Sequence, residues 1–79
     1  MEEHEAFLEE RYNETYDLVI ADLTQKKANG YSMDRIKMDL DSYYIRIDQD
    51  FDGRGQLFHI KMTATIAAYE ALLHEWGEL

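Results

Sequence analysis

Apolar side chains recur every three or four residues along the first third of the chain, which is the spacing of one face of an α-helix. This stripe consists of Leu8, Tyr12, Tyr16, Val19 and Leu23. The segment ends at Asn29-Gly30, where glycine can adopt the left-handed conformation that closes many helices. The pattern therefore predicts one long helix over residues 2–28.

A helical period also fits the rest of the chain. Ser32 can cap a second helix, whose apolar positions are Met33, Ile36, Leu40, Tyr43, Ile47 and Phe51. A third helix follows Gly55 and has two apolar rows, one of Leu57, Ile60, Ala64, Ala67 and Ala71 and one of Ala68, Leu72 and Trp76. Gly77 provides its stop. This reading predicts an all-α fold of three helices.

The middle of the chain fits a strand period as well. The segments that alternate apolar and polar residues are 36–40, 43–47 and 58–62. A turn at Asp41-Ser42 would place their apolar sets on one face of a three-stranded antiparallel meander between two helices, which is an α+β fold. That meander would set Lys37, Arg46 and Lys61 side by side, where like charges are unfavourable. We therefore expect three helices and keep the α+β fold as the alternative.

Length and composition limit the architecture further. The 79 residues suffice for one core, so we expect a single domain over residues 1–79. Cysteine is absent, which excludes disulfides and thiolate metal sites and suits a reducing compartment. The N-terminus is acidic where a targeting peptide would be basic, and Glu70 interrupts the longest apolar run. We expect a cytoplasmic protein without a membrane segment.

The chain is strongly acidic, with 17 acidic and 8 basic residues and a net charge of −9. Such a charge opposes binding to nucleic acids and to anionic membranes, so the partner we expect is a basic protein. Much of the negative charge lies before residue 24, whereas Lys and Arg dominate residues 24–37. Glu10, Glu14 and Asp17 recur along one face of the predicted first helix. They are candidate partner-binding residues.

A second acidic patch follows the predicted second helix. Asp48, Asp50, Asp52 and Gly53 match positions one, three, five and six of a loop that resembles the EF-hand calcium loop. Position twelve is His59, where bidentate coordination of calcium needs Glu. We therefore interpret the segment as a polar connector, with the three aspartates as weak cation ligands and as further candidates for binding a protein. No cofactor is predicted.

Catalytic chemistry has little support in the sequence. His4, His59 and His74 are far apart and lack the spacing of a zinc pair. Neither a glycine-rich phosphate loop nor a nucleophile elbow occurs. We predict that the chain is not an enzyme.

Two further side chains complete the predicted partner-binding set. Arg54 lies between two glycines, where its guanidinium can reach a carboxylate or phosphate. Tyr44 belongs to an aromatic group large enough to contribute to a protein interface. The other members of that group are Tyr43, Tyr69 and Trp76.

A small acidic protein without cysteine or proline and rich in tyrosine resembles, in general character, the inhibitors that phages and mobile elements use against host defence systems. Anti-CRISPR proteins and DNA mimics are the best-known members. The resemblance implies that carboxylates on a helix imitate a phosphate strand and occupy the basic nucleic-acid groove of a host protein such as a CRISPR effector. Two alternatives stay open, a weak calcium-binding module at residues 48–59 and a structural homodimer.

Overall fold

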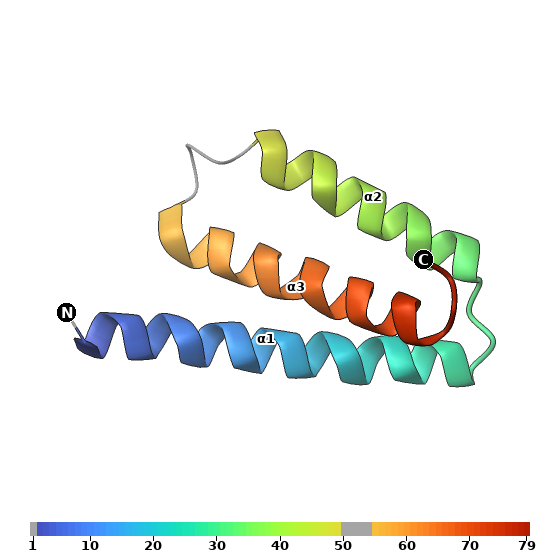
Figure 1. The fold of residues 1–79 in the computed structure, drawn as a ribbon, viewed down its shortest axis with the longest axis horizontal. Helices are drawn as coiled ribbons and strands as arrows, with labels where there is room; N and C mark the ends of the chain where they lie inside the picture. The colour runs from blue at the N-terminus through green and yellow to red at the C-terminus, as the bar shows by residue number, and fades with distance from the viewer. Residues whose placement is uncertain (1, 50–54) are drawn as a thin grey trace.

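Three helices make up the fold of the computed structural model, which describes residues 2–49 and 55–79, with side chains described for 6–49 and 56–79 (Figure 1). The helices are α1 (Glu2–Ala28), α2 (Met33–Gln49) and α3 (Gly55–Glu75). No strand occurs within these described ranges. The prediction of an all-α fold with a long first helix is confirmed, and the alternative α+β meander is wrong.

The side chains of α2 explain why the helical period prevails in the middle of the chain. Ile36 and Leu40 are buried on one face of α2, and the Ser32 hydroxyl accepts a hydrogen bond from the backbone N–H of Arg35 at 3.4 Å. The meander would also have buried Met38, on the same strand face as Ile36 and Leu40, and Ile45 on the next strand. In the helix Met38 is 68% exposed and Ile45 is 58% exposed.

The central helix of the fold is α3, which lies between α1 and α2 (Figure 1). Helices α1 and α3 run in the same direction, and α2 runs in the opposite one. The molecule measures 43 × 24 × 17 Å and has a radius of gyration of 13.6 Å. A compact chain of this length would have a radius of gyration of about 12 Å, so the fold is elongated.

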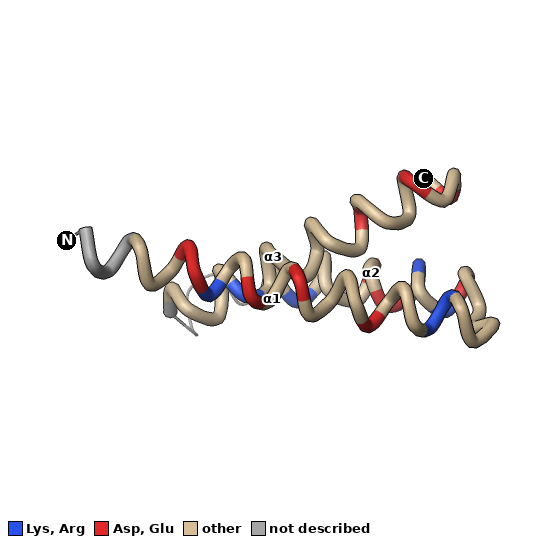
Figure 2. The backbone as a smooth tube through the Cα atoms, turned by 90° about the horizontal axis from the view of Figure 1, so that it is seen from below, with Lys and Arg blue, Asp and Glu red and all other residues tan. Residues whose placement is uncertain are grey.

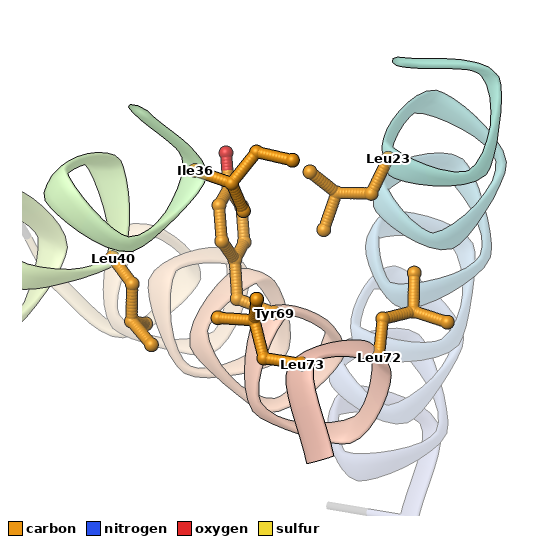
Figure 3. Packing of buried hydrophobic residues seen from close by; sticks show 6 residues of the cluster. All are labelled: Leu23, Ile36, Leu40, Tyr69, Leu72 and Leu73. Carbon is orange, nitrogen blue, oxygen red and sulfur yellow. The ribbon is translucent and has the colours of Figure 1, made fainter. Parts of the chain in front are cut away.

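The hydrophobic core lies where the end of α1, the start of α2 and the end of α3 meet (Figure 3). Its buried members are Leu23, Ile36, Leu40, Tyr69, Leu72 and Leu73. The rings of Tyr43 and Tyr69 pack edge to face, with their centroids 5.3 Å apart. Edge-to-face packing is favourable because the positive ring edge meets the negative ring face.

Small side chains allow α3 to approach α1 closely. Ala64, Ala68 and Leu72 recur every four residues on α3, and Leu72 lies beside α1 (Figure 3). Both alanines are fully buried. Nearer the start of α1, Leu8 is buried as well, as is Met62 on α3.

The predicted apolar rows of α3 were only partly correct. Leu57 and Ala71 were expected on a buried row, but both are exposed. The face toward α2 instead includes Tyr69 and Leu73, which the rows omitted. Phe51, expected on the apolar face of the second helix, lies outside the described residues.

Two glycines end the helices as predicted. Gly30 and Gly77 have φ angles of +79° and +75°, the left-handed region that favours glycine. In each case the N–H of the next residue donates to a carbonyl five residues earlier, which is the Schellman arrangement. The pairs are Tyr31 with Lys26 at 2.9 Å and Glu78 with Leu73 at 2.8 Å.

Candidate functional site

Three carboxylates form an exposed row on α1, and we call Glu10, Glu14 and Asp17 the acidic row. They follow one another at four and three residues, so they lie about 6 and 4.5 Å apart along the helix axis. The row lies on the side of α1 away from the buried Leu8 and Leu23. Figure 2 shows acidic positions recurring along α1. The structure thus brings these three predicted residues together on one accessible surface.

One member of the acidic row has a basic neighbour on the same helix. The Arg11 Nη2 atom donates to Glu14 Oε1 at 2.9 Å, while the Arg11 guanidinium lies 5.4 Å from the ring centroid of Phe7. In the part of the chain that the structure describes, Glu10 and Asp17 form no ion pair. The row therefore retains most of its negative charge.

The second predicted acidic patch is separate from this row. Asp48 is exposed near the end of α2, on the other side of α3 from α1 (Figure 1). Because the acidic row faces away from α3, Asp48 does not extend it. Asp50, Asp52 and Arg54, which were also predicted to bind a partner, lie outside the described residues.

Tyr44 has an internal partner for its hydroxyl group. The hydroxyl donates a hydrogen bond to the carboxylate of Glu70 on α3. This hydrogen bond, with a smaller contribution from burial, raises the pKa of Tyr44 to about 12. The residue remains 39% exposed, so part of its surface stays available to a partner. The sequence did not reveal this contact because the two residues are 26 positions apart.

The remaining aromatic residues of the predicted interface group serve mainly the core. Tyr69 is buried, and this burial raises the pKa of its hydroxyl, with a further contribution from Tyr43. Trp76 packs against the core cluster, and the Lys27 ammonium lies 5.3 Å from its ring centroid. Only Tyr44 of this group is exposed.

The basic segment 24–37 spans the end of α1 and the start of α2, and two of its four basic residues are paired with acids. Lys26 Nζ lies 3.1 Å from Asp22 Oδ2, and Lys37 Nζ lies 2.9 Å from Glu78 Oε1. The hydrogen bond to the carboxylate is the main reason why the pKa of each lysine is raised. These two pairs offset part of the positive charge at this end of the molecule.

Exposed apolar side chains are the feature that sequence reasoning missed. They include Phe7 and Leu18 on α1 and Met38 and Ile45 on α2. Each lies outside the apolar stripe of its helix. This position was the sign in the sequence that these side chains would be exposed.

Other kinds of site find little support in the described part of the chain. It contains no pocket and no cluster of His, Asp and Glu suited to a metal ion; His59 and His74 are exposed on α3. None of its helices is long and apolar enough to cross a membrane. No family model matches the sequence, and no curated protein or solved structure is significantly similar to it.

Proposed function

We propose that this chain is a small acidic inhibitor that occupies the basic nucleic-acid groove of another protein, and that the acidic row on α1 is its contact surface. The observation that carries the proposal is the placement of Glu10, Glu14 and Asp17 on one exposed face, opposite the face that packs in the core. The net charge of −9 favours a basic partner over a nucleic acid or an anionic membrane.

The mechanism is electrostatic imitation of a phosphate strand. One DNA strand places a charge about every 3.4 Å along the helix axis, and the carboxylates of the row recur at a comparable spacing of about 4.5 to 6 Å. The packing of α1 against α3 holds the row in place, so little ordering is required when the partner binds. Lysine and arginine side chains in the groove would then pair with carboxylates instead of phosphates.

The acidic row is a better candidate than the patch that includes Asp48. Its three members share one rigid helix, whereas Asp48 stands alone among the described residues of its patch. The general resemblance to phage and mobile-element inhibitors favours a CRISPR effector or a similar defence nuclease as the partner. The acidic row itself specifies a basic groove and not one particular protein.

The first experiment captures the partner directly. The full chain is immobilised, incubated with host lysate at roughly 50 mM salt and washed with salt up to roughly 500 mM, which shortens the range of charge interactions. Captured proteins are then eluted with duplex DNA. We expect nucleic-acid-binding proteins that both salt and DNA release. Capture that persists at high salt or in excess DNA would contradict the proposal.

Two triple variants then locate the contact surface. In one, Glu10→Gln, Glu14→Gln and Asp17→Asn neutralise the acidic row. In the other, an equal number of exposed acids on the other helices is neutralised by Asp41→Asn, Asp48→Asn and Glu75→Gln. Both variants have the same net charge. The first should weaken binding about 10- to 100-fold and the second less than about threefold; equal losses would show that only overall charge matters.

A further inference from the structure

A flank of α1 beside the acidic row combines exposed apolar and paired charged residues. Phe7 is 45% exposed and Leu18 is 71% exposed. Because a helix turns about 100° per residue, these two residues, eleven positions apart, point in nearly the same direction. Arg11 and Glu14 lie between them. We call these four residues the α1 flank; Glu14 belongs to both the flank and the acidic row.

The α1 flank has an internal symmetry that the acidic row lacks. Phe7 and Leu18 lie equally far along the helix from the point midway between Tyr12 and Asn13. Arg11 and Glu14 are also equally far from that point. A two-fold axis beside this point, perpendicular to the helix, would place each member of a pair opposite the other member in a second copy. A second copy packed antiparallel would therefore bring Phe7 against the partner's Leu18 and Arg11 near the partner's Glu14.

The charges on the flank suit this arrangement. Arg11 donates from Nη2 to its own Glu14 at 2.9 Å, and its side chain is 33% exposed. A guanidinium has five N–H donors in a fork, so it can contact two carboxylates at once. In the antiparallel pair, two arginines and two glutamates would form one closed network of alternating charge.

We propose that a second copy of this chain covers the α1 flank and forms an antiparallel homodimer. An unrelated partner would not require apolar and charged residues to be spaced symmetrically about one point, whereas a two-fold dimer does. The flank is smaller than the roughly 800 Å² that each partner contributes to a stable interface, so we expect a dissociation constant on the order of 100 μM.

The two copies repel through their net charge, but this repulsion acts mainly over distances that physiological salt screens. The Debye length is about 8 Å under those conditions. The apolar contacts and the Arg11–Glu14 network act at shorter range. Moderate salt should therefore favour the dimer over very low salt.

One consequence of the dimer bears on the proposed function and rests on it. Glu10 and Asp17 of the acidic row lie on one side of the α1 flank, so the two-fold axis would place these carboxylates of both copies on the same side of the dimer. Glu14 would lie in the charge network at its centre. With helix axes about 8–10 Å apart, the dimer would present two antiparallel rows of carboxylates. Two antiparallel rows resemble a duplex more closely than one row does. The dimer itself does not depend on this consequence.

Sedimentation equilibrium of the full chain tests the dimer. We expect the average mass to rise from monomer toward dimer as the concentration increases from about 1 μM to about 1 mM. Leu18→Ser should raise the dissociation constant at least about tenfold, without a change of net charge. Met38→Ser, which removes an equally exposed apolar residue from α2, should leave it unchanged. Circular dichroism checks that each variant retains its helices.

A charge exchange tests the register. Arg11→Glu and Glu14→Arg should each raise the dissociation constant about tenfold, because each variant places like charges at the centre. The double variant restores opposite charges and the original net charge, so it should dimerise like the unmodified chain. If net charge alone controlled association, Glu14→Arg would strengthen it.

Three results would overturn the dimer: a monomeric mass at about 1 mM, sensitivity to Met38→Ser but not to Leu18→Ser, or failure of the double variant to restore association. These outcomes are separable from failure of the proposed function. Leu18→Ser leaves the acidic row intact. The lysate capture experiment does not depend on the mass measured by sedimentation. A chain that stays monomeric yet captures a basic protein refutes the dimer alone.

Discussion

The hydroxyl of Tyr44 on α2 donates a hydrogen bond to the carboxylate of Glu70 on α3. An ion pair of 2.9 Å between Lys37 and Glu78 also ties α2 to the end of the chain. The buried residues of α2, Ile36 and Leu40, lie in its first half. The Tyr44–Glu70 contact therefore helps to hold the second half of α2 against α3.

Replacing Tyr44 with Phe removes this hydrogen bond and keeps the ring. We expect the free energy of unfolding to fall by about 0.5–1 kcal/mol, a modest value because water screens the partly exposed pair. Urea denaturation followed by circular dichroism measures the change. Tyr31→Phe is the matched control, since Tyr31 is about equally exposed and its ring contact with Lys26 does not need the hydroxyl. Equal losses in both variants would contradict a stabilising role for the Tyr44 hydroxyl.

Alkaline pH should weaken the fold through the same contact. The pKa of Tyr44 is raised to about 12 in the folded protein, from about 10 in an unfolded chain. A raised pKa means that the neutral hydroxyl is stabilised by folding, so its contribution is complete below pH 10 and is lost as the pH rises toward 12. The pKa values of Tyr69, Lys26 and Lys37 are also raised, which adds losses of the same sign.

Urea denaturation at a series of pH values from about 8 to about 12 measures this alkaline loss. The free energy of unfolding should decline less steeply in Tyr44→Phe than in the unmodified chain. Tyr31→Phe should keep the original slope. Identical slopes in all three proteins would show that Tyr44 does not contribute.

The core near the end of α3 should tolerate little truncation. Leu73 is fully buried, and Leu73→Ala should cost about 2–5 kcal/mol through lost burial and a cavity. A chain of this length has a total stability of roughly 4–12 kcal/mol, so a large drop in the thermal midpoint should follow. Leu79→Ala is the control, because Leu79 is 63% exposed. A cost below about 0.5 kcal/mol for Leu73→Ala would contradict the observed packing.

The close approach of α1 and α3 depends on small side chains. Ala68 is fully buried, so Ala68→Leu should overpack the contact and cost about 1–3 kcal/mol. Ala71→Leu on the same helix should change stability by less than about 0.5 kcal/mol, because Ala71 is exposed and leucine is a good helix former. Thermal unfolding distinguishes the two variants. Similar midpoints would mean that Ala68 has room for a larger side chain.

The sequence by itself determined α1, its apolar stripe, of which Leu8 and Leu23 are buried, and the glycines that end α1 and α3. Helical periodicity and capping are local, and in α1 no other period competed with the helical one. Local pattern also placed Glu10, Glu14 and Asp17 on one face, because the geometry of a single helix fixes their relative directions.

Only the tertiary structure decided the middle of the chain and the surroundings of the site. Residues 33–64 fitted both periods, and the choice depended on whether Met38 and Ile45 found a partner surface. Because α3 packs against helices on two sides, it buries two faces, and a single apolar row could not describe it. The Tyr44–Glu70 contact and the separation of Asp48 from the acidic row likewise follow from how the helices pack, which local spacing does not encode.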